Sequence, residues 1–502
     1  MSRNTLPCLA AASLFLALAA AAQQTSMPGM DMSTHAAKKQ SPSKQSAKDS
    51  NMNMPGMNMS GSSSMSMSQP ATLIQSILAH TTSGTSIEPA STPMPMLMTH
   101  RGAWTLMLHG LGSVADIQQQ SRPTATSFPL ATCLPNDAPC SPIDRRGGDK
   151  LYSVNWIMPM AMRQLGSHGQ YGQLTLRTML SLEPATVSAR QFPELFQQGE
   201  TAFGKPIVDG QHPHDFFMEL GALYDLHLGE HALLSLYAAP IGDPAVGPTA
   251  YPHRLSASED PLAALGHHQQ DSTHIAFNVL TAGVTYRTLR LEASGFHGAE
   301  PDEQHWGFQP SPNGLAIDSY STRLTFSPRP NWTAQYSLAH ITSPESLYPG
   351  EDQARQTASL MYNRPFGPTD TSGSPSGNWS NTLLWGRTRS LADNAKENSY
   401  LLESLLQFHT RNFLWTRIEN AGRSNELLLS PNTPLPPNFH ESPLGHVAEY
   451  SLGFDRDLFT AHHLRIAPGA QFTSYTTPTP LIPAYGTRPY GVVAFLRFRL
   501  SN

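Results

Sequence analysis

The sequence is poor in charged residues, in cysteine and in long apolar runs. Charged residues make up only 14% of its 502 residues, whereas roughly 25% is usual in soluble proteins. After residue 22 there is no run of about 18 apolar residues, which excludes membrane-spanning helices. The 32 basic residues are spread thinly among 37 acidic ones, so the clustered Lys and Arg of a nucleic-acid-binding protein are missing. Any membrane contact must therefore be made by strands.

Residues 1–22 have the features of a signal peptide. One Arg precedes an apolar stretch, and three Ala provide the small-residue cleavage site. Export places the mature chain in an oxidising compartment. Of its three cysteines, one lies in the leader, and the other two, Cys133 and Cys140, lie close together in a Pro-rich loop. Their spacing predicts one local disulfide rather than a redox or metal pair.

Residues 23–100 are rich in Ser, Met, Pro and Thr and have few residues that can build a core. Such a segment cannot offset the entropy of folding, so a disordered tail in the periplasm is predicted. The segment from Ala71 to His80 is an exception, because its apolar residues recur at helical spacing. It can dock at the mouth of the body, although a stray helical turn in a linker is the favoured interpretation.

Residues 101–502 alternate between apolar and polar residues in segments bounded by Gly, Pro, Asn or Asp, which is typical of strands. The segments are centred near Leu108, Trp156, Leu176, Leu223, Leu236, Val279, Leu291, Leu324, Tyr336, Leu360, Leu384, Leu402, Trp415, Leu452, Ile466 and Ala494. Their connections alternate long and short, and the connection from Phe366 to Gly377 fits least well. This pattern predicts an all-β fold, a transmembrane antiparallel barrel of about 16 strands in the lipid of a Gram-negative-type outer membrane. The long loops at 116–149, 184–216 and 241–271 should be exposed outside the cell.

The polar faces of these strands carry charges of both signs in mid-strand, which we expect to line the lumen. They are Arg177, Glu219, Asp225, Arg290, Glu292, Arg323, Glu403, Glu449, Asp455, Arg465 and Arg497. A barrel of this size has room for an aqueous channel unless loops or a plug fill it. The charges can create a field across a constriction, or they can pair along the wall. Met107, His109, Met179 and Met361 also face inward, but their scatter along the chain indicates a packing role.

Nine of the chain's 20 Met lie within 41 residues of the tail, in the stretches SMPGMDMSTH and NMNMPGMNMSGSSSMSMS. They are Met27, Met30, Met32, Met52, Met54, Met57, Met59, Met65 and Met67, and His35 lies among them. Because this segment forms no core, packing does not explain its Met content. Thioethers are soft ligands that favour Cu(I) and Ag(I). The alternative is a solvated linker whose Met content is incidental.

These two stretches resemble the Met-rich N-terminal extension of the copper-resistance outer-membrane protein B family, over about forty residues. The resemblance implies an outer-membrane barrel that helps cells to tolerate periplasmic copper. A periplasmic copper carrier or an efflux component would then be a partner.

Histidines are concentrated in two of the long loops, His212 and His214 in GQHPHDFF and His267 and His268 in GHHQQDSTH. Imidazoles beside acidic residues can form a site for Zn(II) or Cu(II), and Asp209, Asp215, Glu219, Asp260 and Asp271 are the candidate partners. No sharp metal signature such as HExxH is present, so a loop-packing role is favoured for most of these side chains. The stretch GETAFGK, from Gly199 to Lys205, matches a phosphate-binding loop only by chance.

Three functions remain open from the sequence. The favoured one is a non-enzymatic barrel for copper or silver handling, whose tail binds the metal and whose barrel acts as a conduit or anchor. The first alternative is a general or substrate-specific porin with a dispensable tail. The second is an outer-membrane metal-dependent hydrolase, which requires three ligands to converge on one point.

Overall fold

The computed structural model describes residues 70–128, 143–272, 276–300, 304–307, 316–345, 347–369, 374–430, 433–437, 439–461 and 463–500. The predicted signal peptide, the Met-rich stretches with His35, and Cys133 and Cys140 lie outside these residues. The metal and disulfide predictions for them therefore stay predictions. No helix among the described residues is long and apolar enough to cross a membrane.

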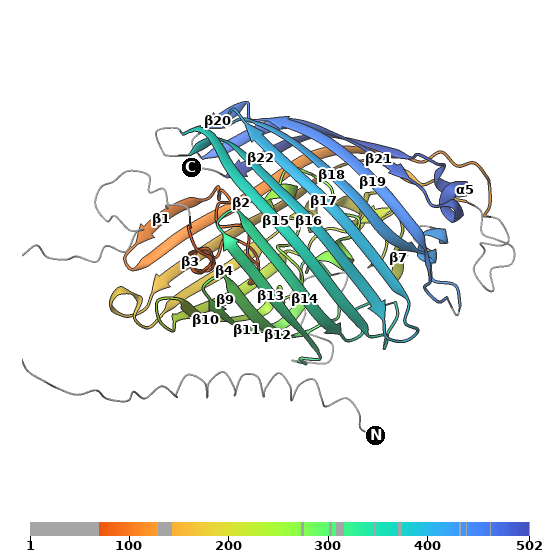
Figure 1. Cartoon of the computed structure of the whole chain (residues 1–502). Coiled ribbons are helices and arrows are strands. Elements are labelled where there is room, and N and C mark those ends of the chain that lie inside the picture. The colour runs from red at the N-terminus through yellow and green to blue at the C-terminus, as the bar shows by residue number, and fades with distance from the viewer. Residues whose placement is uncertain are drawn as a thin grey trace, which may run out of the picture. The chain divides into compact units, whose positions relative to one another are not determined.

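The described chain forms a closed antiparallel barrel (Figure 1). Its main sheet has 18 strands, and without the short β1 (Leu97–Arg101) and β20 (Phe459–Ala461) sixteen remain in the ring. Closure comes from the pairing of β2 with β22, from Leu111 opposite Arg499 to Gln120 opposite Tyr490. The ring consists of β2 (Trp104–Gln120), β3 (Gly147–Gln164), β4 (Gln173–Leu180), β9 (Phe217–His227), β10 (Ala232–Gly242), β11 (Ala276–Tyr286), β12 (Leu289–His297), β13 (Ser319–Arg329), β14 (Trp332–Ile341), β15 (Gln353–Thr369), β16 (Pro375–Ser390), β17 (Lys396–Phe408), β18 (Asn412–Ser424), β19 (Pro443–Arg456), β21 (Leu464–Thr476) and β22 (Tyr490–Leu500).

The predicted fold is confirmed, since each of the sixteen predicted segment centres lies in a different strand of the ring. The connection that fitted least well is mainly strand, because β15 continues to Thr369 and β16 begins at Pro375. Short turns at one end, such as 287–288, alternate with long connections at the other end, such as 243–275. We call these the short-turn end and the long-loop end of the barrel.

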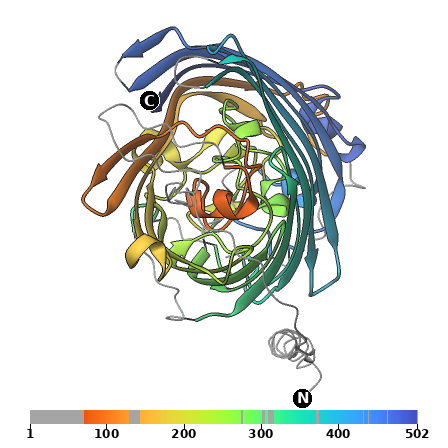
Figure 2. The same cartoon turned by 60° about the vertical axis from the view of Figure 1, so that its left-hand side comes forward.

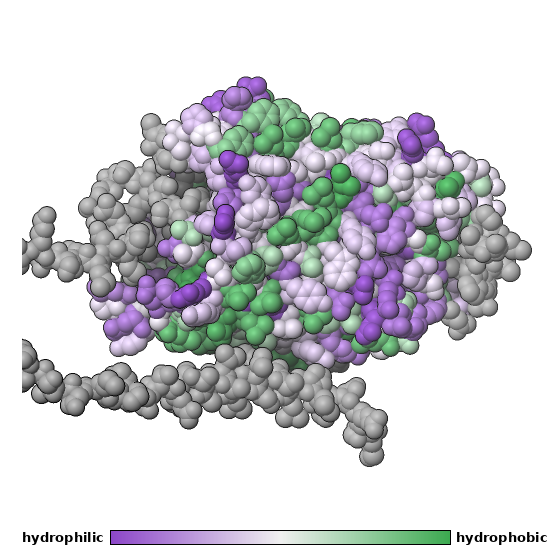
Figure 3. All heavy atoms as spheres, viewed as in Figure 1, coloured by the Kyte–Doolittle hydropathy of each residue, from purple (hydrophilic) through white to green (hydrophobic). Residues whose placement is uncertain are grey.

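The outer face of the barrel is apolar, as the alternation predicts. On β13 and β14, Leu324 and Tyr336 are 47% and 42% exposed, whereas the intervening Arg323 and Ser337 are buried inside. Figure 3 shows such hydrophobic side chains spread over the strands. Because side chains alternate across a strand, an outer face for lipid requires the polar residues to face the lumen.

The lumen is filled by three inward-folded segments, which Figure 2 shows within the ring of strands. The plug segment, residues 70–96, includes α2 (Leu73–Ala79). The first inner loop, residues 181–216, contains α3 (Glu183–Thr186), η3 (Ser188–Arg190), β5 (Phe192–Pro193), β6 (Glu200–Ala202), β7 (Lys205–Ile207) and β8 (Gly210–Gln211). The second inner loop, residues 243–272, contains η4 (Leu255–Ala257) and α4 (His267–Gln270). Smaller elements are η2 (Ser167–Gly169), η5 (Asn425–Leu428), η6 (Thr479–Leu481) and α5 (Ile482–Tyr485).

The prediction that the whole of 23–100 is disordered is wrong for residues 70–100. In α2, Thr72 caps the helix by accepting a hydrogen bond from the backbone N–H of Gln75, and Leu73, Ile74 and Ile77 are buried. The imidazole of His80 lies 2.5 Å from the carboxylate of Asp225 on β9. A few apolar residues and buried polar contacts, such as that of His80 with Asp225, therefore dock a segment whose overall composition resembles that of a linker.

The plug segment lies across the short-turn end of the barrel. Ser91 donates its backbone N–H to Pro330 in the turn between β13 and β14, at 2.9 Å. The Thr85 hydroxyl accepts a hydrogen bond from Arg323 at 2.9 Å. Pro330 lies in a short turn and Arg323 lies in the middle of β13, whereas His80 contacts β9. The segment therefore reaches from this end into the lumen and spans it from wall to wall.

The prediction that the long loops 184–216 and 241–271 are exposed is also wrong, because both fold into the lumen and are largely buried. Charge pairing explains why. Arg254 of the second inner loop binds Glu403 of β17 at 2.7 Å, and Asp260 binds Arg417 of β18 at 3.1 Å. A charge inside a protein is stable only when it is paired, so the wall charges and the loop charges require each other.

The mid-strand charges do face the lumen, and all of those predicted except Arg465 are buried. Several pair along the wall, such as Arg177 with Glu219 at 2.7 Å and Arg323 with Glu292 at 2.9 Å. These wall charges therefore form ion pairs with the inner loops and with one another. This arrangement favours the pairing interpretation over a field across an open constriction.

Candidate metal centre

Two inner loops bring one carboxylate and three imidazoles together inside the barrel. Glu200 begins β6, whose hairpin with β7 turns through Phe203 and Gly204, both at positive φ. Such a two-residue turn fixes the direction of the flanking strands. His267 and His268 open α4, and His212 follows β8. We call these four side chains, Glu200, His212, His267 and His268, the Glu200 cluster.

The Nε2 atoms of three histidines surround one oxygen of Glu200. Oε1 of Glu200 lies 3.3 Å from His268, 3.4 Å from His267 and 3.7 Å from His212. The ligand atoms of Glu200, His267 and His268 all lie within 4.8 Å of one another. Ligands about 2.0–2.1 Å from a tetrahedral zinc ion are separated from each other by about 3.3 Å. The distances from Glu200 to His267 and His268 are therefore close to those between two ligands of one ion.

Backbone carbonyl groups orient two of the rings. Nδ1 of His267 lies 2.6 Å from the carbonyl oxygen of Ala264, and Nδ1 of His212 lies 2.6 Å from that of Pro213. Such a ring turns Nε2 toward the carboxylate, and any proton on Nε2 leaves when a metal binds, which gives the usual arrangement of a metal-binding histidine. The other oxygen of Glu200 accepts the backbone N–H of His212 at 3.0 Å. The donor atoms thus face each other before any ion binds.

Burial and charge set the protonation states of the cluster. Burial, and then the neighbouring His267, lower the pKa of His268 to about 3, so its ring is neutral at pH 7. Burial alone would raise the pKa of Glu200, but His212 and the hydrogen bonds from His267 and His268 outweigh it and hold that pKa well below its ordinary value. A carboxylate beside a neutral imidazole is the protonation state that binds a metal.

The cluster has a buried negative charge that three imidazoles face, together with the side-chain amide of Gln211, which donates to the same oxygen at 2.5 Å. The side chains of Glu200 and His267 are 1% and 2% exposed, whereas His268 and His212 are 14% and 22% exposed. Among the described residues, every ion pair of Glu200 is with a histidine. A buried carboxylate needs a compensating cation, either a proton on a ring or a metal ion. The greater exposure of His212 marks the side from which an ion would enter.

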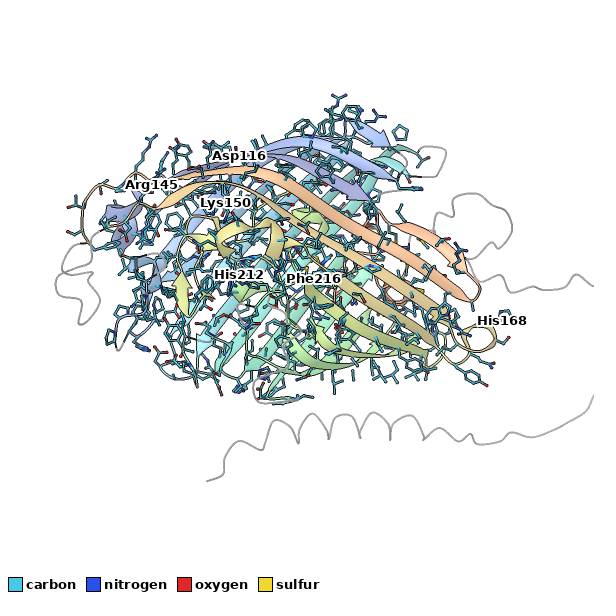
Figure 4. All side chains as sticks on the ribbon, turned by 180° about the vertical axis from the view of Figure 1, so that it is seen from behind. Asp116, Arg145, Lys150, His168, His212 and Phe216 are labelled. Atoms are coloured by element: carbon cyan, nitrogen blue, oxygen red, sulfur yellow. The ribbon has the colours of Figure 1, made fainter. Side chains whose placement is uncertain are left out.

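His214 is the one predicted loop ligand that lies outside the cluster. Its Nδ1 lies 2.9 Å from Glu183, and its Nε2 lies 3.3 Å from the hydroxyl of Tyr251. His305 pairs with Asp215 at 2.5 Å and stacks on His212, with ring centroids 5.3 Å apart. These side chains form a layer behind the cluster. Figure 4 shows His212 between the ends of the barrel that Arg145 and His168 mark.

None of the five acidic residues predicted as partners belongs to the cluster. Asp209 pairs with Arg146, Asp215 with His305, Glu219 with Arg177, Asp260 with Arg417 and Asp271 with Arg254. The carboxylate that the histidines do share, Glu200, lies in the stretch GETAFGK. There β6 and β7 form a hairpin and no helix follows, so the rejection of a phosphate-binding loop holds. The only local signal for Glu200 was an acidic residue among apolar and small neighbours.

The fold places the chain in the class of transmembrane β-barrels. Among solved structures, similar chains include an anion-selective porin from Comamonas acidovorans, with 11% identity, a TM-score of 0.41 and coverage of 79% of this chain and 100% of that one. OmpF of Salmonella typhi, in a complex with daunomycin, has 9% identity, a TM-score of 0.44 and coverage of 80% and 100%. The outer membrane channel DcaP of Acinetobacter baumannii has 9% identity, a TM-score of 0.40 and coverage of 80% and 99%.

No protein-family model matches the chain, and no curated protein does. At this level of likeness to the solved structures, the fold stands on the strand pairing of the chain itself. What the lumen binds has to be argued from its side chains.

Proposed function

We propose that the chain is an outer-membrane barrel for metal handling, which binds a divalent transition-metal ion, Zn(II) or Cu(II), at the Glu200 cluster. The observation that carries this proposal is the convergence of three Nε2 atoms on one buried carboxylate oxygen. Imidazole and carboxylate ligands suit these two ions better than Mg(II) or Ca(II), which prefer all-oxygen shells.

The filled lumen supports a specific binding role over general diffusion. A general porin needs a continuous aqueous path, but the plug segment and both inner loops occupy the lumen and pair with its wall. Passage of a solute would require at least one of these segments to move. The remaining porin alternative is a substrate-specific channel. Bilayer conductance distinguishes this channel from the proposed function.

The ligand set favours binding over hydrolysis. A catalytic zinc site has three protein ligands and one open position for water, whereas a structural or storage site is closed by four. His212 provides a fourth ligand, a nitrogen 3.7 Å from the shared oxygen. We therefore keep the interpretation that the chain is not an enzyme.

The Met-rich tail extends the proposal to copper or silver. Its nine thioethers suit Cu(I) or Ag(I), and we place the tail in the periplasm because short turns mark the periplasmic end of outer-membrane barrels and the plug segment lies at that end. A periplasmic copper carrier or efflux component is the expected partner. If protease added to intact cells cut the tail at Lys38 or Lys44, this orientation would be wrong.

The test is a titration of the purified, chelator-treated full-length protein with Zn(II) and Cu(II) by calorimetry. Glu200→Gln keeps the shape of the side chain but removes its charge, and we expect its affinity to fall at least tenfold, as for altered metal sites generally. Glu183→Gln is the matched control, because it changes a buried carboxylate of the same loop that also faces a histidine. Its affinity should stay within about twofold.

Equal affinity in the wild type and in Glu200→Gln would refute the proposal. Conductance in planar bilayers separates the alternatives further. A large conductance that neither metal alters would favour the porin, whereas a small or metal-dependent conductance supports the proposed function.

A further inference from the structure

The methionines of the barrel are gathered in one place. Of the ten Met among the described residues, nine lie in a single cluster formed by the last residues of the plug segment and by strands β1 to β9, and only Met361 of β15 lies elsewhere. Its members are Met94, Met96, Met98, Met107, Met158, Met160, Met162, Met179 and Met218. We call these residues the Met cluster. Residues that only fill gaps would be distributed over all sixteen strands.

The strand register places three of these thioether side chains in a row. Met98 of β1 is opposite Met107 of β2, which in turn is opposite Met160 of β3. Directly opposite residues of an antiparallel pair have Cβ atoms about 4.5–5.5 Å apart. Flexible Met side chains on such positions can bring their sulfur atoms to a common ion.

A histidine lies beside three methionines of the Met cluster. We call Met107, Met158, Met160 and His109 the Met patch. His109 lies two residues after Met107 on the same face of β2 and is opposite Met158 of β3. Met107, Met158 and Met160 are at most 3% exposed. Nδ1 of His109 is buried and has no hydrogen-bond partner among the described residues. Its ring stands edge-on to Trp156, with centroids 4.7 Å apart. A buried imidazole nitrogen without a partner is costly, and a bound ion would satisfy it.

The patch differs from the rest of the wall in chemistry. On β14 and β15, neighbouring lumen positions are polar, and Ser337 and Thr357 share a hydrogen bond at 2.7 Å. The Met patch has three thioethers instead, which cannot bind hard cations. Arg177, opposite Met160, pairs with Glu219 through bonds of 2.9 Å and 2.7 Å. Arg499, which lines the same cavity as His109, pairs with Glu259. Both cations are therefore compensated and leave little net charge to repel a monovalent ion.

The location suits an ion that arrives along the chain. Met94, Met96 and Met98 directly follow the plug segment or belong to its last residues, and β1 lies beside β2 at the short-turn end (Figure 1). The Met-rich stretches precede the plug segment in sequence. Thioethers therefore occur before the plug, after it and on the lumen wall.

We infer that Met107, Met158 and Met160, together with His109, form a second metal site, specific for a soft monovalent cation such as Cu(I) or Ag(I). Neutral thioethers suit a singly charged ion, because the cost of taking an ion out of water rises with the square of its charge. The site differs in ligand chemistry from the Glu200 cluster and does not rest on the function proposed for that cluster.

Methyl NMR of the full-length protein in detergent, labelled with ¹³C at the Met methyl carbons, tests this inference with Ag(I) as the probe. Single Met→Leu variants at 107, 158 and 160 assign three signals, because such volume-conserving changes are well tolerated in protein cores. Added Ag(I) should shift these three signals as well as those of the tail. If the three keep their positions when the tail signals have reached saturation, the inference is wrong.

Two controls make the result specific. Met361 also faces the lumen and is buried, so its signal, assigned by Met361→Leu, should not move. His109→Ala should weaken the Ag(I) response of the three signals at least tenfold, whereas a purely structural His109 would leave it unchanged. Glu200→Gln should leave all three shifts intact, which separates a failure here from a failure of the divalent site.

Discussion

Gly386 of β16 lies directly under α4, the helix that carries His267 and His268. A Cβ at this position would be 2.1 Å from the carbonyl oxygen of Gln269 and 2.5 Å from its carbon. Contacts below 3.0 Å do not occur, so in Gly386→Ala the helix must retreat by about 1 Å. Metal sites tolerate deviations of only about 0.2 Å in their ligand distances. The substitution should therefore disturb the Glu200 cluster without touching any of its residues.

The expected loss follows from the cost of overpacking. Forcing extra volume into a packed interior costs about 1–3 kcal/mol. If that strain is relieved by moving α4, the affinity for Zn(II) falls by about 5-fold to 150-fold, since 1.4 kcal/mol corresponds to a factor of ten. Calorimetric titration of the purified full-length protein measures this change directly.

The matched control is Gly283→Ala on β11, also a lumen-facing glycine of the wall. Its nearest neighbours are side-chain atoms of Glu292 and Arg290, at 3.1 Å and 3.2 Å, which can move slightly aside. Its Zn(II) affinity should be unchanged. If Gly386→Ala binds Zn(II) as tightly as the wild type does, then α4 does not hold the ligands in place and the reasoning from Gly386 fails.

Three further predictions concern other parts of the chain. A peptide covering Met27–Met67 should bind Cu(I) in competition with a chelator and lose this binding when its nine Met are changed to Leu; uptake by the Leu peptide would contradict the prediction. Mass spectrometry without reductant should find Cys133 and Cys140 bridged, and alkylation of both thiols in native membranes would disprove it. Burial raises the pKa of Glu88 from 4.5 to about 7, against the hydrogen bond from the backbone of Leu255. The docked plug therefore holds a proton that the undocked one loses, and its docking should weaken by on the order of 3 kcal/mol as pH rises from 4.5 to about 7. Hydrogen exchange of the plug segment, corrected for intrinsic rates, should show this loss in the wild type, and an equally steep loss in Glu88→Gln would exclude Glu88 as its source.

The strands of the barrel could be predicted because their signal is local. Alternation with a period of two requires only that one face meets lipid and the other meets the lumen, and Leu324 beside Arg323 shows it within two residues. The same alternation predicted that the wall charges face the lumen. The lengths of the connections, which are also a local property, predicted that short turns alternate with long loops.

Tertiary contacts decided where the long loops lie. The pairing of Arg254 with Glu403 joins residues that are 149 positions apart, and no local pattern shows that such charges will meet. The same holds for the plug segment, which a linker-like composition conceals. Loops that were expected to be exposed because they are polar fold into the lumen instead, because their charged residues form ion pairs with the wall.

Both candidate sites depend on long-range placement. The histidines could be named from their spacing, but Glu200 meets His267 and His268 only because two separate loops fold against each other. The Met cluster depends on strand register, which places Met107 opposite Met160 although more than fifty positions separate them. The sequence by itself determined which residues face inward, since that follows from periodicity. Which inward residues become neighbours was decided only by the closed barrel, because register and loop docking are settled by contacts between distant parts of the chain.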